Sequence, residues 1–223
     1  MKKIFLPIVV SLLLAGCDDD MVRSKADLTL LVSFVPYYED NEPFNITPSG
    51  LGLLQGWFGD MNAQMPVNRI YSAPEVGGRG EKAERFLEIA ERNGDRSYNR
   101  YEDWIKYSGR SCCADNYQAV HARCLNAAWD DAHPVGSSLD DILEIEYGSY
   151  AEYVRAGYPD NLPSGKTYRK KLSELKKDDM SMIDPYFYFY SDPVPPAGTY
   201  EMEVTLVTTE GEEKTATCTL VIE

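Results

Sequence analysis

Four cysteines beyond the N-terminal region are the residues of this chain best suited to covalent chemistry. They are Cys112, Cys113, Cys124 and Cys218. The N-terminus, described below, indicates export, and four cysteines in an exported chain predict two disulfides. Adjacent cysteines rarely bridge each other, because the geometry of the bond does not fit neighbouring residues. We therefore expect Cys112 and Cys113 to pair with Cys124 and Cys218, in either order, with free thiols as the alternative.

The two histidines, His121 and His133, offer alternative chemistry at two places. Zinc prefers thiolate and imidazole ligands, which Cys112, Cys113, His121 and Cys124 would supply. Their spacing, however, lacks the paired Cys-x₂₋₄-Cys arrangement of structural zinc sites. The disulfide hypothesis is therefore preferred over a zinc site.

A second group of metal-ligand types consists of Asp130, Asp131 and His133. Two carboxylates and an imidazole are suitable ligands for a divalent ion. The same Asp-Asp-Ala-His-Pro sequence is also typical of a turn that leaves a strand, because proline disfavours a helical conformation in the residue before it. We expect the turn, and we predict neither a bound metal nor a cofactor.

The charge balance argues against a nucleic-acid-binding protein, and the lack of a recognisable catalytic pattern argues against an enzyme. Thirty-six Asp and Glu residues against 22 Lys and Arg residues give a net charge of −14, without a basic stripe, so we expect no nucleic-acid partner. So many carboxylates make chance pairs common, and no Ser-His-Asp or Cys-His arrangement is recognisable. We expect a non-catalytic protein, with a hydrolase that acts on glycans through a carboxylate pair as the alternative.

The N-terminus indicates where the protein resides. Lys2 and Lys3 precede an apolar run over residues 4–14, which is typical of a signal peptide and too short to span a bilayer stably. The following Leu-Ala-Gly-Cys sequence resembles the lipobox of bacterial lipoproteins. This resemblance implies cleavage after residue 16 and lipidation of Cys17, which would anchor the protein to a membrane.

Residues 17–25 are predicted to form the lipidated cysteine and an acidic tether. Asp18, Asp19 and Asp20 resemble the surface-export signal of Bacteroidetes lipoproteins. In enteric bacteria an Asp after the cysteine resembles an inner-membrane retention signal instead. We expect a lipid-anchored protein of the cell envelope, in the outer membrane and exposed at the surface, with a periplasm-facing location as the alternative.

The elements of the first half are predicted from periodicity and helix-breaking residues. Residues 27–36 indicate a strand, and residues 37–80, rich in Pro and Gly, indicate a long irregular region. Residues 81–92 have helical periodicity and end at Asn-Gly, a helix stop. Aromatic residues over 98–107 recur at helical spacing, which predicts a second helical segment with a buried face.

The second half has mostly strand patterns. The clearest is the alternation over residues 200–208 and 215–222 around Glu-Gly-Glu-Glu, which resembles the closing hairpin of an immunoglobulin-like sandwich. Its inward set includes Cys218. The other predicted elements are strands over 117–129 and 139–147, a helical turn over 149–155, and an ambiguous segment over 168–175.

Aromatic side chains provide the candidate ligand platform. In the Tyr-Phe-Tyr-Phe-Tyr run over residues 186–190, strand alternation places Phe187 and Phe189 on one face and three tyrosines on the other. A row of tyrosines on an open sheet face suits sugar rings or a protein partner, although a packed strand with half-buried tyrosines is the alternative. The candidate platform residues are Tyr186, Tyr188, Tyr190, Trp57 and Phe58.

The lipobox, the acidic triplet and residues 133–141 running into the terminal hairpin together resemble uncharacterised surface lipoproteins of gut Bacteroidetes with immunoglobulin-like domains of unknown function. The resemblance implies a mainly β fold: an immunoglobulin-like β-sandwich with an N-terminal strand and a packed helical segment. We divide the chain into residues 1–16, 17–25, 26–114 and 115–223, the last being the sandwich. We expect a surface binding or interaction module for a glycan or a protein, with a structural accessory subunit as a further alternative.

Overall fold

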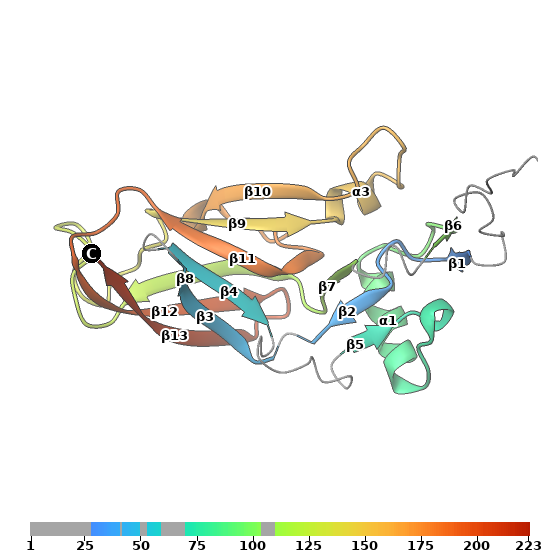
Figure 1. Cartoon of the computed structure of the whole chain (residues 1–223), viewed down its shortest axis with the longest axis horizontal. Coiled ribbons are helices and arrows are strands. Elements are labelled where there is room, and N and C mark those ends of the chain that lie inside the picture. The colour runs from blue at the N-terminus through green and yellow to red at the C-terminus, as the bar shows by residue number, and fades with distance from the viewer. Residues whose placement is uncertain (1–27, 41, 50–52, 59–69, 104–109) are drawn as a thin grey trace, which may run out of the picture.

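The computed structural model describes residues 28–40, 42–49, 53–58, 70–103 and 110–223. The predicted signal peptide, the lipidation site Cys17 and the acidic tether lie outside the described residues. Two hydrophobic cores organise the described part, one inside a β-sandwich and one in a smaller unit that contains the longest helix. Figure 1 shows the sandwich on the left and the smaller unit, with α1, on the right.

The sandwich consists of two antiparallel sheets. One is five-stranded in the order β10-β9-β11-β4-β3, and the other is three-stranded in the order β13-β12-β8. The five-stranded sheet contains β3 (Phe44–Ser49), β4 (Leu53–Phe58), β9 (Leu143–Ser149), β10 (Lys166–Lys171) and β11 (Ile183–Ser191). The three-stranded sheet contains β8 (Tyr117–Cys124), β12 (Gly198–Thr208) and β13 (Glu213–Ile222).

Alternation of apolar and polar residues along the strands forms the sandwich core. Val204 and Leu206 of β12 and Phe187 and Phe189 of β11 belong to the same buried cluster, and all four side chains are at most 1% exposed. Burial of such side chains removes apolar surface from water, which is the main stabilising contribution to the fold. The predicted fold class, a mainly β sandwich with a small packed helical part, is confirmed.

The smaller unit combines short strands with helices. β2 (Tyr37–Glu39) pairs with β5 (Ile70–Ser72) and, in parallel, with β7 (Ser111–Cys113), while β1 (Thr29–Leu31) pairs with β6 (Arg100–Glu102). The helical elements of the described residues are α1 (Glu81–Arg92), α3 (Ala151–Arg155), η4 (Pro74–Val76) and η5 (Leu172–Glu174). None of the described helices is long and apolar enough to cross a membrane.

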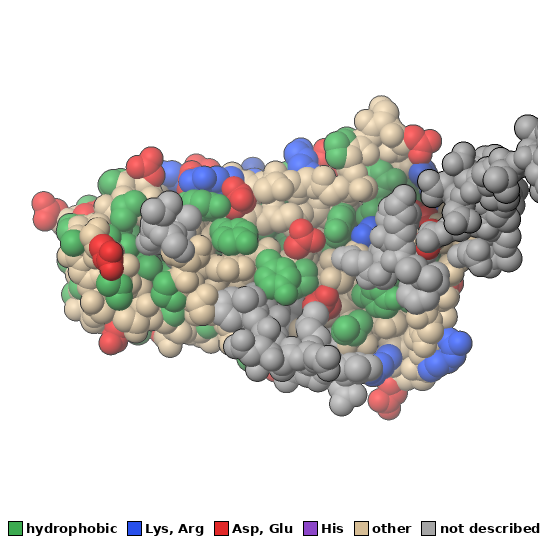
Figure 2. Space-filling model, viewed as in Figure 1, with side chains coloured by type: hydrophobic (Ala, Val, Ile, Leu, Met, Phe, Trp, Pro, Cys, Tyr) green, Lys and Arg blue, Asp and Glu red, His purple; other side chains and the backbone are tan. Residues whose placement is uncertain are grey.

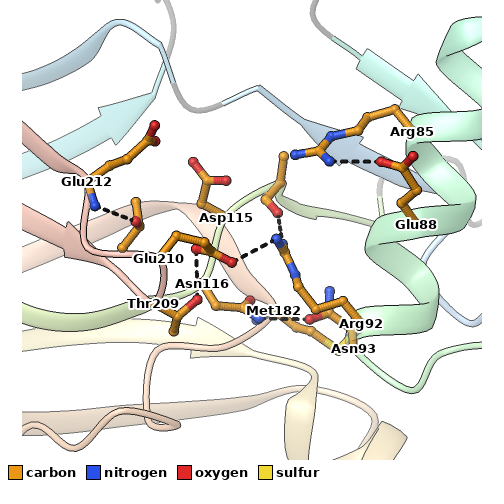
Figure 3. Close-up of polar contacts among 12 residues, drawn as sticks. Arg85, Glu88, Arg92, Asn93, Asp115, Asn116, Met182, Thr209, Glu210 and Glu212 are labelled. Atoms are coloured by element: carbon orange, nitrogen blue, oxygen red, sulfur yellow. Dashed lines mark hydrogen bonds and ion pairs between the residues drawn. The ribbon is translucent and has the colours of Figure 1, made fainter.

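Polar contacts join the smaller unit to the sandwich (Figure 3). The Asn116 amide donates to Asn93 Oδ1 at 2.8 Å, and its Oδ1 accepts from the backbone N–H of Met182 at 3.0 Å. Arg92 at the end of α1 pairs with Glu210 in the β12–β13 turn at 3.3 Å. The two cores are therefore connected by directional bonds as well as by chain continuity.

The local sequence patterns gave correct predictions for several elements. The helix over 81–92 is confirmed as α1, and the terminal hairpin as β12 and β13. The predicted strand over 117–129 forms but ends at Cys124, and the helical turn over 149–155 is present as α3. The ambiguous segment over 168–175 is strand β10 followed by η5.

Three predictions in the first half are wrong. Of the described residues 28–36 of the strand predicted over 27–36, residues 29–31 form β1, because the chain bends at residues 32–34 before β2. The region 37–80, predicted as irregular, contributes β3 and β4 to the sandwich sheet. The predicted helical segment over 98–107 begins as coil and β6, since Tyr98 packs on Phe34 in an aromatic cluster (ring centroids 5.2 Å apart) instead of on a helix face. Residues 104–109 lie outside the described residues.

The predicted domain boundary at residue 115 does not separate the two cores. β3 and β4, which precede it, complete the five-stranded sheet of the sandwich. Tyr153 and Val154 of α3, which follow it, belong to the core of the smaller unit. Segments from both sides of residue 115 therefore contribute to each core.

Candidate functional site

The tyrosine face of β11 is the first component of the candidate site. Tyr186 and Tyr188 are 47% and 37% exposed, while Phe187 and Phe189 are buried, so the predicted alternation is confirmed. Tyr190 is less accessible, because the Arg169 guanidinium lies 3.9 Å from its ring centroid and its hydroxyl donates to Glu146 at 3.4 Å. Two of the three tyrosines therefore remain open to a ligand.

Trp57 and Phe58, the other predicted platform residues, lie on β4, which pairs with β11. The backbone of Trp57 is in register with Tyr186. The side chains of Trp57 and Phe58 lie outside the described part of the structure, so this part of the prediction stays a prediction.

A β-bulge in β11 brings a carboxylate beside the tyrosines. Ile183 pairs with Ser149 and Phe187 with Tyr147, so three residues of β11 face the single residue Gly148 of β9. A Cβ atom added to Gly148 would lie 2.1 Å from Asp184 Oδ2, which shows that the carboxylate occupies the space above this glycine. Bulges commonly redirect side chains next to functional sites, and this one directs Asp184 to the tyrosine face.

A groove of about 410 Å³ runs along this face and onto the smaller unit. We call it the tyrosine groove. Figure 2 shows green apolar and tyrosine side chains beside red acidic ones over the strands that carry it. Its walls come from β2, β7, β9, β10 and β11. The lining residues that matter below are Glu39, Ser111, Glu146, Asp184, Tyr186 and Tyr188.

Two carboxylates in the groove are partly removed from water. Burial raises the pKa of Glu39, which the Ser111 hydroxyl bond opposes and the nearby charge of Asp184 reinforces. Burial also raises the pKa of Asp184. Neither carboxylate forms an ion pair with another of the described residues. Desolvated carboxylates without a cation are strong acceptors for any donor that enters the groove.

The groove therefore combines two chemical capacities. Tyr186 and Tyr188 present aromatic rings with an apolar face and a polar edge. Glu39, Glu146 and Asp184 present carboxylate oxygens that accept hydrogen bonds. Its volume lies within the range of roughly 300–1,000 Å³ that is usual for ligand sites.

The structure forms neither of the two predicted disulfides, because all four of the described cysteines are free. Cys124 and Cys218 both pair in register with Met202, on opposite sides of β12. Two strand spacings separate them by roughly 10 Å, beyond the limit of about 7 Å between Cα atoms for a disulfide. This rules out a bridge between these two cysteines.

Cys112 and Cys113 are directed towards the chain around β11. The Cys112 thiol donates to the carbonyl oxygen of Met182 at 3.2 Å, and the Cys113 thiol to that of Asp184 at 3.7 Å. Both are fully buried, one in each core, and burial raises the pKa of each thiol well above its ordinary value. These protonated thiols therefore behave as small apolar residues.

The turn interpretation of residues 129–134 is supported by its hydrogen bonds. Asp130 Oδ1 accepts from the backbone N–H of Ala132 and of His133, each at 2.8 Å. The His133 imidazole lies between Asp130 (2.7 Å) and Asp141 (3.1 Å), whereas Asp131 is exposed and makes none of these bonds. Asp130, followed by Asp141, raises the pKa of His133.

Metal-ligand geometry is not found at either group proposed from the sequence. His121 is engaged by Asp140 at 2.8 Å and does not join the three cysteines named with it. Among the described residues no three His, Cys, Asp or Glu side chains are placed to bind a metal ion.

Sequence reasoning found the tyrosines of the groove but missed its carboxylates. Glu39 lies on a three-residue strand that reaches the groove only through pairing with β7. Asp184 directly precedes Pro185 and the aromatic run, and an Asp-Pro pair at the start of a strand is a recognisable sign of a bulge. This pair was the one local indication that the strand begins irregularly.

Comparison of the chain with known protein families, with curated proteins and with solved structures finds no match.

Proposed function

We propose that this protein is a non-catalytic binding module whose ligand is a glycan held in the tyrosine groove. The observation that supports the proposal best is the placement of two exposed tyrosines next to desolvated carboxylates that have no cation partner among the described residues. Exposed tyrosines alone are compatible with ordinary surface packing, but the combination offers both contacts that a sugar ring requires.

The chemistry of a sugar ring matches the groove. A pyranose has an apolar C–H face, which packs against the ring of Tyr186 or Tyr188, and a rim of hydroxyl groups. Those hydroxyls donate hydrogen bonds to Glu39, Glu146 or Asp184, and bonds to charged acceptors are about twice as strong as neutral ones. A neutral ligand of this kind also avoids repulsion by the acidic surface.

Binding of the purified full chain to an array of oligosaccharides tests this proposal. We expect binding to at least one glycan, and we expect Tyr188→Ala to weaken it by about tenfold or more, since exposed aromatic contacts commonly dominate binding energy. Tyr101→Ala is the matched control, because Tyr101 is 66% exposed on β6 and does not line the groove. Equal loss in both variants would contradict the assignment of the groove.

A carboxylate-pair hydrolase is the second candidate function. It is favoured by the presence of Glu39 and Asp184 in one groove, because burial raises the pKa of both carboxyls, which is the direction of shift that a general acid requires. Release of reducing ends from the bound glycan would support this candidate. Glu39→Gln should then abolish release while it preserves much of the binding.

We propose further that the module is attached to the outer membrane through lipidated Cys17 and faces the outside of the cell. The proposal rests on the Leu-Ala-Gly-Cys sequence and the acidic residues that follow it. Protease treatment of intact cells, with a periplasmic protein as control, tests it. Digestion of this protein while the control survives is expected, and protection until lysis would indicate a periplasm-facing location.

A further inference from the structure

A second cavity lies under α3, on the side of the sheet where β9 and β10 meet the loop before β11. Its volume is about 380 Å³, and we call it the α3 pocket. It shares only Tyr147 with the tyrosine groove, so it is a separate site. The lining residues used below are Tyr147, Glu152, Arg155, Tyr168, Asp178 and Asp179.

The Tyr147 hydroxyl is a buried donor without an acceptor in the part of the chain that the structure describes. The side chain is 2% exposed, and its oxygen has no hydrogen-bond partner among the described residues. Its ring stacks on Tyr168, with ring centroids 5.6 Å apart, so the hydroxyl is held in a fixed direction. Burial raises the pKa of Tyr147, reinforced by the nearby charge of Asp179, which keeps the hydroxyl protonated. A buried polar group left unpaired is costly, and a water, an ion or a ligand that accepts this hydrogen bond would remove the cost.

Two of the acidic groups around the pocket are already neutralised. Glu152 pairs with Lys166 at 2.7 Å and accepts the Tyr168 hydroxyl at 2.6 Å. Asp179 pairs with Lys170 at 2.8 Å and accepts the backbone N–H of Lys176. These carboxylates therefore contribute little net charge towards a ligand.

Arg155 and Asp178 are left without an ion pair among the described residues, although Ser181 connects them. The Arg155 guanidinium donates to Ser181 Oγ at 3.0 Å, and the Ser181 hydroxyl donates to the backbone carbonyl of Asp178 at 3.1 Å. One cation, one carboxylate and the buried Tyr147 hydroxyl thus lie around the same cavity. The set is neutral in sum but has opposite charges at separate points.

From this arrangement we infer that the α3 pocket binds a small zwitterion of the α-amino acid type. The ligand carboxylate meets Arg155 and accepts the proton of the Tyr147 hydroxyl, and the ligand ammonium meets Asp178. A simple anion would leave the unpaired Asp178 carboxylate without a cation, and a simple cation would leave Tyr147 without an acceptor. The zwitterion is the ligand class that satisfies all three groups at once.

Thermal-shift and calorimetric titration of the full chain with the twenty free L-amino acids tests the inference. We expect at least one of them to raise the melting temperature and to bind. The N-acetyl derivative and the carboxamide of that amino acid, each lacking one charge, should bind at least about tenfold more weakly. The N-acetyl carboxamide of the same amino acid, which lacks both charges, serves as the neutral polar probe and should not bind.

Three variants assign the contacts. Tyr147→Phe, Arg155→Gln and Asp178→Asn should each weaken binding about tenfold or more, whereas Asp131→Asn, at an exposed carboxylate of a different loop, should not. Tyr147→Phe removes only an unpaired hydroxyl, so the variant should remain as stable as the wild type, which circular dichroism and melting will confirm. The inference is overturned if no amino acid binds at millimolar concentration, or if binding survives Tyr147→Phe. Glycan binding in the tyrosine groove is measured separately and does not depend on these outcomes.

Discussion

Asp95 provides the sharpest test of what holds the smaller unit together. Its carboxylate is completely buried just after α1. It accepts the backbone N–H of Phe34 at 2.7 Å, that of Val35 at 2.9 Å and the Tyr158 hydroxyl at 3.0 Å. Those donors come from sequence positions about sixty residues away on either side, so this one side chain joins three segments.

The expected loss in the free energy of unfolding follows from the groups that Asp95→Ala leaves without a hydrogen-bond partner. Two buried N–H groups lose their acceptor, and each unsatisfied group costs about 1–3 kcal/mol. The Tyr158 hydroxyl also loses Asp95 but keeps a longer contact with the Gly94 carbonyl oxygen at 3.5 Å. Burial raises the pKa of Asp95, which shows that the ionised carboxylate is itself disfavoured in the fold, so its removal returns part of that cost. We expect a net loss of about 3 kcal/mol, which for a domain of this size lowers the melting temperature by about 6–12 °C.

Urea denaturation and thermal melting, followed by circular dichroism, measure this loss. Asp95→Asn keeps one acceptor and should lie between the wild type and Asp95→Ala. Asp160→Ala is the control, because Asp160 is 89% exposed in its ion pair with Arg100 and should change the melting temperature little. If Asp95→Ala melts within about 2 °C of the wild type, the carboxylate contributes little to holding the three segments together, and the reasoning is refuted.

Three further predictions concern the groove and the sandwich. Because burial raises the pKa of Glu39, the folded state holds this proton to a higher pH than the unfolded state does. The wild type should therefore lose stability relative to Glu39→Gln as the pH rises through the folded pKa. In denaturation experiments the two free energies of unfolding should converge at acidic pH and differ at neutral pH, and a difference that does not change with pH would contradict this. Gly148→Ala should displace the Asp184 carboxylate and weaken glycan binding, measured by calorimetry, with unchanged affinity as the contrary result. Phe187→Ala should lower the free energy of unfolding by about 3–5 kcal/mol in urea titrations, since the side chain is fully buried, and a loss below about 1 kcal/mol would show that the core repacks.

The elements that were predictable from the sequence are those defined by neighbouring residues. α1 has a repeating apolar face and stops at Asn93, followed by Gly94 with a φ of 72°, a conformation that glycine adopts readily. The terminal hairpin likewise has alternation on both strands and a polar turn between them. In these segments the local preference and the tertiary structure agree.

The β3–β4 hairpin was not predictable, because its pairing partner lies far away in the sequence. Gly56 weakens a strand when considered locally, yet a Cβ atom there would lie 2.1 Å from the Phe187 ring. The glycine is needed so that β4 can pair with β11 while Phe187 fills the core. Only the sheet order, not the spacing of apolar residues, reveals this requirement.

The candidate site was half predictable for the same reason. Alternation along a single strand identified Tyr186 and Tyr188, whereas Glu39 reaches the groove through a parallel pairing between short strands. The aromatic spacing over residues 98–107 predicted a helix that does not form over the described residues 98–103. Tyr98 packs in a cluster with Phe34 and Tyr158 instead of on a helix face. A site whose residues come from several segments is therefore hard to predict from the sequence of any one segment.

Asp95 and the groove carboxylates show how buried acids in one fold can have different roles. Asp95 accepts hydrogen bonds from three donors of the protein itself, which offset part of the cost of its burial, and its role is structural. Glu39 receives a bond from Ser111 alone, and burial is the single cause that raises the pKa of Asp184. A fold that needed these two groups only for stability would be better served by neutral residues of similar shape. Their burial beside exposed tyrosines, with fewer protein donors than Asp95 has, is therefore the physical reason for the proposal that a ligand binds in this groove and supplies further donors.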